Sequence, residues 1–192
     1  MSTPTDEEKV DLLLSCRYGD LEDVQVYVQK FGKDAISSVR DENANTMLHM
    51  ICANGHDDLL DFVLPITPPS LLSAQNNAGS TPLHWAALNS HLTTVQKLVQ
   101  FSNGPGIDLI DIKNNAGHSP LAEAELAGWD EGAKWLVQMM NLDAKGDEKD
   151  GEEDDDADVG TATNPGSQDI EVEIQDADGQ VAKMTISSGD QK

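Results

Sequence analysis

The sequence predicts an all-α solenoid of about four stacked helical repeats with short β-turn tips, followed by an acidic, disordered C-terminal tail. A motif of the form Thr-x-Leu-His begins at Thr46 and Thr81 and returns in altered form at Ser119, at separations of 35 and 38 residues. The residues expected to end the first helix of each repeat lie 36, 35 and 38 residues apart: Gly19, Gly55, Ser90 and Gly128. Regular periods of this length are typical of repeat proteins.

The third repeat, near residues 76–112, carries the motif most completely. Gly79 supplies a turn position that needs a positive φ, Thr81 caps the helix, and Pro82 occupies the first helical position, where its missing N–H costs nothing. Ala86 and Ala87 let neighbouring helices approach closely. This pattern resembles the ankyrin repeat, which has a period of about 33 residues and consists of a β-turn and two helices.

The other repeats lie near residues 8–40, 41–75 and 113–142. The first keeps the helical apolar pattern but lacks the turn, as expected for an N-terminal cap. The fourth replaces the motif histidine with Ala122 and places Glu125 at a position that is usually small, so we expect it to be the C-terminal cap. The residues expected to close its core are Trp129, Trp135, Leu136 and Met139. The ankyrin-repeat domain is thus predicted to span residues 1–142.

The tail, residues 143–192, contains 16 acidic and 4 basic residues, against 19 and 8 in residues 1–142. Residues 147–158 consist almost entirely of Asp, Glu, Lys and Gly, a composition that cannot bury enough apolar surface to fold. Residues 169–186 differ, because acidic and apolar residues alternate over 169–175 and a second, largely apolar run at 181–186 follows the Asp178-Gly179 turn. This pattern indicates a β-hairpin, which would be marginal alone and would either form on a partner or remain transient.

Charge and composition exclude several functions. The formal net charge of −23, with no basic stripe, predicts no direct nucleic-acid binding and favours basic partners. No apolar run approaches the roughly 20 residues of a membrane span, and no signal peptide is visible, so we expect no membrane and an intracellular location. Cys16 and Cys52 occupy equivalent positions in stacked repeats about 10 Å apart, too far for a disulfide. They are predicted to be core thiols.

The histidines were natural candidates for catalysis or metal binding. His49 and His84 occupy the motif position where the imidazole ties one repeat to the next, and His56 and His91 are also repeat-equivalent. His118 lies in the fourth turn, and none of the five has a second ligand at metal-binding spacing. No phosphate-binding loop or nucleophile elbow is present. We therefore expect no enzyme, no cofactor and no metal.

The ankyrin resemblance implies a protein-binding surface on the concave face, formed by the turn tips and the outward side of each first helix. Trp85, between Met50 and Glu123, is predicted to be a binding anchor inside a polar rim. The alternative is that Trp85 only packs across the helix surface of its own repeat. The expected partner-binding residues are Arg17, Tyr18, Asp41, Glu42, Met50, Asn54, Asn77, Trp85, Leu88, Asn89, Asn115, Glu123 and Leu126.

Several finer motifs narrow the resemblance: Leu48-His49-Met50, Ala53-Asn54-Gly55-His56, Leu83-His84-Trp85-Ala86 and Glu123-Ala124-Glu125. Followed by an acidic tail, they are similar to the fungal ankyrin-repeat chaperones of the small-subunit KH-domain ribosomal protein. The chain departs from that pattern at Ile51-Cys52 and Ser90. The resemblance implies a monomer that binds this basic ribosomal protein, keeps it away from RNA and accompanies it to assembly. It also implies a cytoplasmic and nuclear location. The alternative is a general ankyrin adaptor in signalling or transcription.

Overall fold

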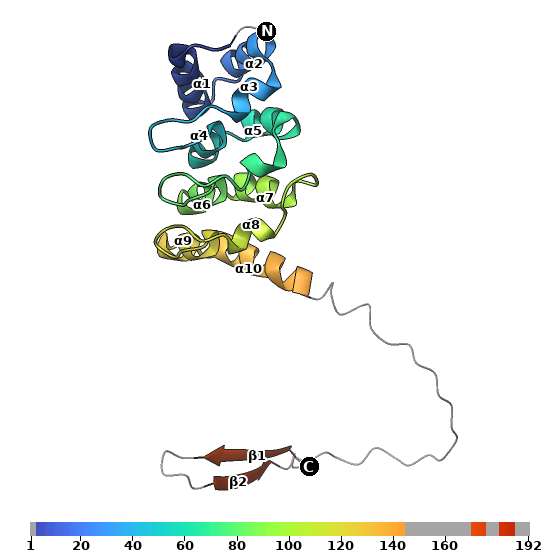
Figure 1. Ribbon diagram of the computed structural model, residues 1–192. Helices are drawn as coiled ribbons and strands as arrows, with labels where there is room; N and C mark the ends of the chain where they lie inside the picture. The colour runs from blue at the N-terminus through green and yellow to red at the C-terminus, as the bar shows by residue number, and fades with distance from the viewer. Residues whose placement is uncertain (1–2, 145–169, 176–180, 187–192) are drawn as a thin grey trace, which may run out of the picture. The chain divides into compact units, whose positions relative to one another are not determined.

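The repeats form a single stack of paired helices (Figure 1). The computed structural model describes residues 3–144, 170–175 and 181–186, which belong to two compact units treated separately below. The pairs, one per repeat, are α1 (Asp6–Tyr18) with α2 (Leu21–Phe31), α4 (Met47–Asn54) with α5 (Asp57–Val63), α6 (Pro82–Leu88) with α7 (Leu92–Gln100), and α9 (Pro120–Leu126) with α10 (Asp130–Ala144). The predicted all-α ankyrin-type fold of about four repeats is confirmed.

The stack is held by its first helices, since α1 packs on α4, α4 on α6 and α6 on α9. Short elements complete the connections between repeats: α3 (Lys33–Ser37), the 3-10 turns Leu64–Ile66 and Pro69–Leu71, and α8 (Asp108–Asp111). A Cβ on Gly79, which has φ 73°, would lie 2.8 Å from the backbone nitrogen of Asn115 in the next tip. This turn therefore needs glycine both for its conformation and for the close approach of neighbouring repeats.

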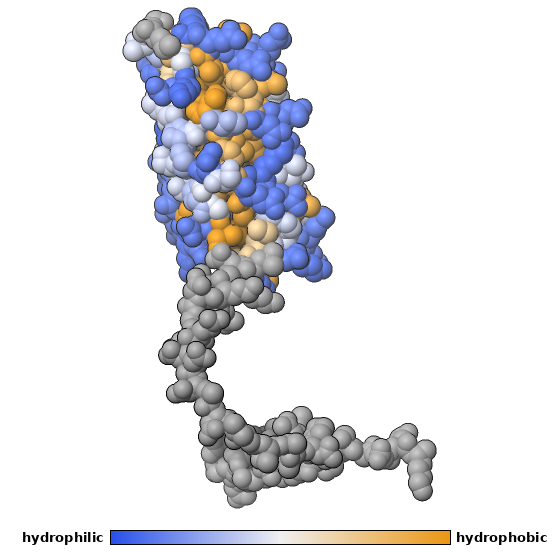
Figure 2. All heavy atoms as spheres, turned by 90° about the vertical axis from the view of Figure 1, so that its right-hand side faces the viewer, coloured by the Kyte–Doolittle hydropathy of each residue, from blue (hydrophilic) through white to orange (hydrophobic). Residues whose placement is uncertain are grey.

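One hydrophobic core runs through all four repeats, and its members include Leu83, Ala86 and Ala87, which are fully buried as predicted. Partly buried apolar residues extend it outward; on the side of α5 and α7, Figure 2 shows a strip of hydrophobic surface bordered by hydrophilic residues. Cys16 and Cys52 are free and buried, which confirms the prediction of core thiols. Burial raises the pKa of the Cys16 thiol to about 12, so this group is protonated and unreactive.

The ends of the stack are closed differently. At the N-terminal end, Thr5 and Glu8 form a capping box that starts α1, with the Thr5 N–H donating to Glu8 Oε2 at 2.8 Å. At the C-terminal end, Leu136 is buried, and the partly buried Trp129, Trp135 and Met139 pack against the core, as predicted for the cap. Glu125 is exposed on α9, which is the last first helix among the described residues. Helix α10 continues to Ala144, two residues beyond the predicted domain boundary.

The second unit is a two-stranded antiparallel sheet of β1 (Ile170–Gln175) and β2 (Val181–Ile186), with Ile170 opposite Ile186 and Gln175 opposite Val181. These strands fall within the segment 169–186, where the alternating pattern indicates a hairpin. The predicted turn at Asp178-Gly179 and most of the tail predicted to be disordered, residues 145–169, 176–180 and 187–192, lie outside the described residues.

Ser90 carries a conformational cost that a single substitution should relieve. It takes the place of the helix-ending glycine in the third repeat and has φ 62°, in the left-handed region. Replacing Ser90→Gly is expected to raise the free energy of unfolding by about 0.5–1 kcal/mol, because glycine adopts this conformation without a Cβ clash. Urea unfolding would measure the change. Ala53→Gly, inside α4, is the matched control and should lower stability by about 1 kcal/mol; equal losses in both variants would contradict the assignment.

Candidate functional site

The turn tips and the exposed sides of α1, α4, α6 and α9 form one continuous surface, here called the first-helix face. Met50, Trp85 and Glu123 each follow their capping residue by four positions and so occupy equivalent places on this face. Leu14 occupies the corresponding place in α1, because it precedes Gly19 by five residues as Met50 precedes Gly55. These four residues, one from each repeat, are called the central row below.

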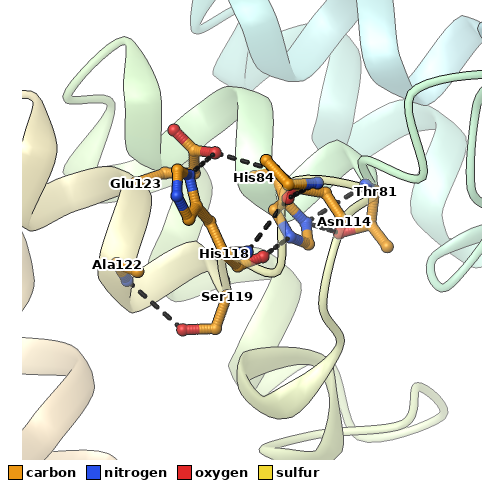
Figure 3. A network of polar contacts seen from close by, with 8 residues as sticks. Thr81, His84, Asn114, His118, Ser119, Ala122 and Glu123 are labelled. Atoms are coloured by element: carbon orange, nitrogen blue, oxygen red, sulfur yellow. Dashed lines mark hydrogen bonds and ion pairs between the residues drawn. The ribbon is translucent and has the colours of Figure 1, made fainter.

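Buried histidines hold this face in register. His49 Nδ1 accepts hydrogen bonds from the N–H and hydroxyl of Thr46 at 3.1 and 2.9 Å, while Nε2 donates to the Ser80 carbonyl at 2.9 Å. His84 repeats the arrangement with Thr81 and donates to the His118 carbonyl at 3.0 Å (Figure 3). Burial lowers the pKa of His49 to about 4 and also lowers the pKa of His84. Both rings are therefore neutral at physiological pH and structural.

A second pair of histidines links each second helix to the preceding repeat. His56 Nε2 donates to the Arg17 carbonyl at 2.8 Å, and His91 Nε2 donates to the Ala53 carbonyl at 3.1 Å. These carbonyls lie in the last turn of α1 and α4, where helical carbonyls lack partners within the helix.

No group of three or more potential metal ligands occurs among the residues that the structure describes, and none of the described helices is long and apolar enough to span a membrane.

Four of the asparagines expected to bind a partner are exposed, but their amide donors already make internal hydrogen bonds. Asn77 donates to the Glu42 carbonyl at 3.1 Å and Asn115 to the Asn77 carbonyl at 3.0 Å, so these two join successive tips. The other two close helix ends, Asn54 on the Met50 carbonyl and Asn89 on the Trp85 carbonyl, both at 2.8 Å. Sequence reasoning assigned them to a partner and missed this structural use.

An apolar groove of about 380 Å³ opens at the N-terminal end of the first-helix face. Val10 and Leu14 are 56% and 43% exposed there, although large apolar side chains on α1 were not predicted to bind. The repeat register carried the signal, since Leu14 is the equivalent of Met50. The groove brings together four predicted residues, Arg17, Asp41, Glu42 and Met50, with six that were missed, Asp6, Lys9, Val10, Leu13, Leu14 and Arg40.

Several charged side chains around this groove already make contacts within the chain. Lys9 pairs with Asp6 at 2.8 Å, and Arg40 Nη1 donates to the Ser37 and Val39 carbonyls at 2.9 and 2.8 Å. The Asp41 carboxylate accepts from the backbone N–H of Asn45 at 2.7 Å and so holds its own turn. The groove therefore offers a partner an apolar floor, and several of the charged side chains around it are already held by internal contacts.

The other predicted residues on the first-helix face differ in how much of the side chain is exposed. Tyr18, Leu88 and Leu126 lie at or near the C-terminal ends of α1, α6 and α9 and are largely exposed, with Leu126 at 66%. Trp85 is half-buried and stands edge-on to His49, with 6.3 Å between ring centroids and 89° between planes. Its indole thus packs partly against the preceding repeat while the rest remains accessible, so its use as an anchor stays a prediction.

Comparisons with known proteins identify a family and two similar proteins. Residues 12–111 and 70–150 match the family model for ankyrin repeats (3 copies). The chain is 33% identical over 116 residues to the ankyrin repeat-containing protein P16F5.05c of Schizosaccharomyces pombe, an alignment that covers 60% of this chain and 75% of that protein. It is also similar, with a TM-score of 0.65 and 27% identity, to a chain in the crystal structure of the yeast ribosomal protein Rps3 in complex with its chaperone Yar1. That match covers 70% of this chain and 95% of the other.

Proposed function

Since the chain belongs to the ankyrin-repeat family, whose stacked repeats present extended protein-binding surfaces, we propose that it is a dedicated chaperone of a basic small-subunit ribosomal protein. The likeness to a chain of the Rps3–Yar1 complex, which extends over 95% of that chain, is the observation that carries this proposal. The chaperone binds its client through the first-helix face, keeps it soluble, and moves with it between cytoplasm and nucleus before the client joins the pre-ribosome.

The charge of the chain supports a basic client. Its formal net charge is −23, and carboxylates greatly outnumber Lys and Arg both in the repeats and in the tail. An acidic surface attracts a basic protein over long range and competes with RNA for it. Release then follows when pre-ribosomal RNA offers the client a denser negative charge.

The first-helix face also offers apolar contact. The groove beside Leu14 and Met50 has an apolar floor, and Trp85 stands next in the central row. A client that carries apolar as well as basic side chains would use both features. Aromatic and apolar anchors contribute most of the affinity at such interfaces, while charged rims contribute rate and selectivity.

The deciding experiment is affinity purification of the tagged chain from its own cells at moderate salt. The proposal predicts recovery of one basic ribosomal protein of the small subunit in near-equal amount. A general adaptor in signalling or transcription is the second candidate, supported by the breadth of functions that the same repeat stack serves. Recovery of a kinase, a DNA-binding complex or a mixture of proteins would decide for the adaptor.

Salt should weaken client binding steeply. Carboxylate contacts with Lys and Arg near the surface are screened within a Debye length of about 8 Å at physiological ionic strength. We expect the affinity to fall about tenfold or more between about 0.1 M and 0.5 M salt, measured by titration calorimetry. Leu14→Ala, which removes apolar contact in the groove, should weaken binding by a similar factor at both salt concentrations. An affinity of the unmodified chain that does not change with salt would point to an apolar interface instead.

Removing the tail should leave the stability of the repeats unchanged but weaken the suppression of client aggregation. A chain ending at Ala144 keeps all of α10 and every described core contact, so its urea midpoint should match that of the full chain. We expect it to suppress client aggregation less well, because most of the removed residues that carry charge are acidic. Client turbidity at equal chaperone concentration is the measurement. A full-length chain whose tail acids are replaced by Asn and Gln is the control, and equal protection by all three proteins would make the tail dispensable.

A further inference from the structure

The central row changes in chemistry along the stack, from Leu14 and Met50 through Trp85 to Glu123. Glu123 is the one carboxylate in the row, and its side chain is only 15% exposed. Its Oε1 accepts from Asn114 Nδ2 at 2.7 Å and from His118 Nδ1 at 3.2 Å (Figure 3). Both donors belong to the tip of the same repeat, so the carboxylate is fixed in place before any partner arrives.

The charge of Glu123 has no permanent cationic partner. Within residues 3–141, no Lys or Arg nitrogen lies within 4 Å of the carboxylate, and Oε2 accepts no hydrogen bond. A largely buried carboxylate is costly unless a cation or a full set of donors compensates it. Here two donors serve one oxygen and leave the second oxygen available.

We propose that Glu123 and Trp85 form a subsite that binds one Arg or Lys side chain of the partner protein. Trp85 stands at the equivalent position of the neighbouring first helix, α6, which packs directly on α9. Equivalent positions on packed helices are about 10 Å apart, so a long cationic side chain placed between them reaches both groups. The carboxylate supplies charge-assisted hydrogen bonds through Oε2, and the indole supplies a cation–π contact.

The same row gives the bound segment a direction. Apolar side chains fit the groove beside α1 and α4, whereas the cationic side chain fits beside α9, at the other end of the first-helix face. A segment that carried these residues in the reverse order along the row would place apolar side chains beside Glu123 and leave its carboxylate unpaired. The identity of the partner rests on the proposed function, but the chemistry of the subsite does not.

The first test uses N-acetyl-arginine amide as the probe and its neutral isostere, N-acetyl-citrulline amide, as the control. The full chain is labelled with ¹⁵N, and the Trp85 indole signal is assigned by its loss in Trp85→Phe. We expect arginine, and not citrulline, to shift the Trp85 indole and the Glu123 amide. Glu123→Gln, which preserves the acceptor oxygen for Asn114 and His118, should abolish the shifts, while Glu125→Gln, exposed on the same helix, should retain them.

Equal shifts with both probes, or shifts spread evenly over the acidic surface, would overturn the subsite. The second test measures the affinity for yeast Rps3: we expect Glu123→Gln to weaken binding about tenfold and Glu125→Gln to change it less than twofold, since only the first carboxylate is desolvated. Equal affinities of Glu123→Gln and the unmodified chain would overturn use of the subsite in client binding. Failure of Rps3 to bind the unmodified chain would instead reject the proposed client, and the arginine titration would still decide the subsite.

Discussion

Lowering the pH from about 7.5 to about 5 is expected to reduce the free energy of unfolding by about 2 kcal/mol through His49 alone. Burial lowers the pKa of His49 to about 4 from an ordinary value of 6.5. Between these two values the unfolded chain binds a proton that the folded chain excludes, so stability falls as the pH falls. Burial also lowers the pKa of His84, which adds to the loss in the same direction.

The structural reason is that Nδ1 of each ring accepts hydrogen bonds from its capping threonine, and a protonated imidazole has no acceptor. Acidification therefore breaks the contacts that start α4 and α6, whereas the Nε2 donor to the carbonyl of the next tip is retained. Urea unfolding at the two pH values measures the change in the free energy of unfolding.

His49→Gln is the informative variant. It should be less stable than the unmodified chain near pH 7.5, yet lose about 2 kcal/mol less on acidification, because the ring that excludes a proton is gone. Direct titration of the His49 ring by NMR should show a neutral imidazole down to about pH 5. A free energy of unfolding that stays constant across this range would show that His49 is not constrained as the hydrogen bonds indicate.

The sequence was sufficient to predict the repeats because the ankyrin-type motif couples local and tertiary constraints at fixed positions. Thr46, Thr81 and Ser119 mark the start of each first helix, and glycine or Ser90 marks its end, so register follows by counting. The internal hydrogen bonds of the predicted asparagines could not be predicted from the repeat register. From the sequence alone, Asn54 and Asn89 are expected at the surface. Only the three-dimensional structure shows that their amides donate to carbonyls at the helix ends.

The groove illustrates a different limit. Arg17 and Tyr18 were predicted to bind as repeat-equivalent positions on the concave face, whereas Leu14 was not among the predicted binding residues. In a helix followed by another repeat, three successive leucines cannot all face the core, and the structure buries Leu12 and Leu13 while leaving Leu14 exposed. The leucine pattern within α1 does not distinguish the three, but the repeat register does, because Leu14 precedes Gly19 by five residues as Met50 precedes Gly55.

Trp85→Ala is expected to weaken client binding by about 2 kcal/mol or more, which corresponds to at least a thirtyfold rise in Kd. The indole is the largest accessible side chain of the central row and lies between the apolar groove and Glu123, where loss of an aromatic removes contact with both kinds of partner residue. The fully buried Leu83, Ala86 and Ala87 supply the core of α6, so the fold should persist without the indole.

Stability and affinity must be measured together, because Trp85 also stands against His49 at 6.3 Å. Urea unfolding is expected to show a modest loss for Trp85→Ala, and titration calorimetry under conditions where the variant is fully folded should show the large loss of affinity. Val26→Ala on α2, exposed and away from the first-helix face, is the control and should cost less than about 1 kcal/mol of binding. A Trp85→Ala variant that unfolds readily yet binds normally when folded would assign the indole to packing between repeats, and the anchor would then have to be sought in the groove beside Leu14 and Met50.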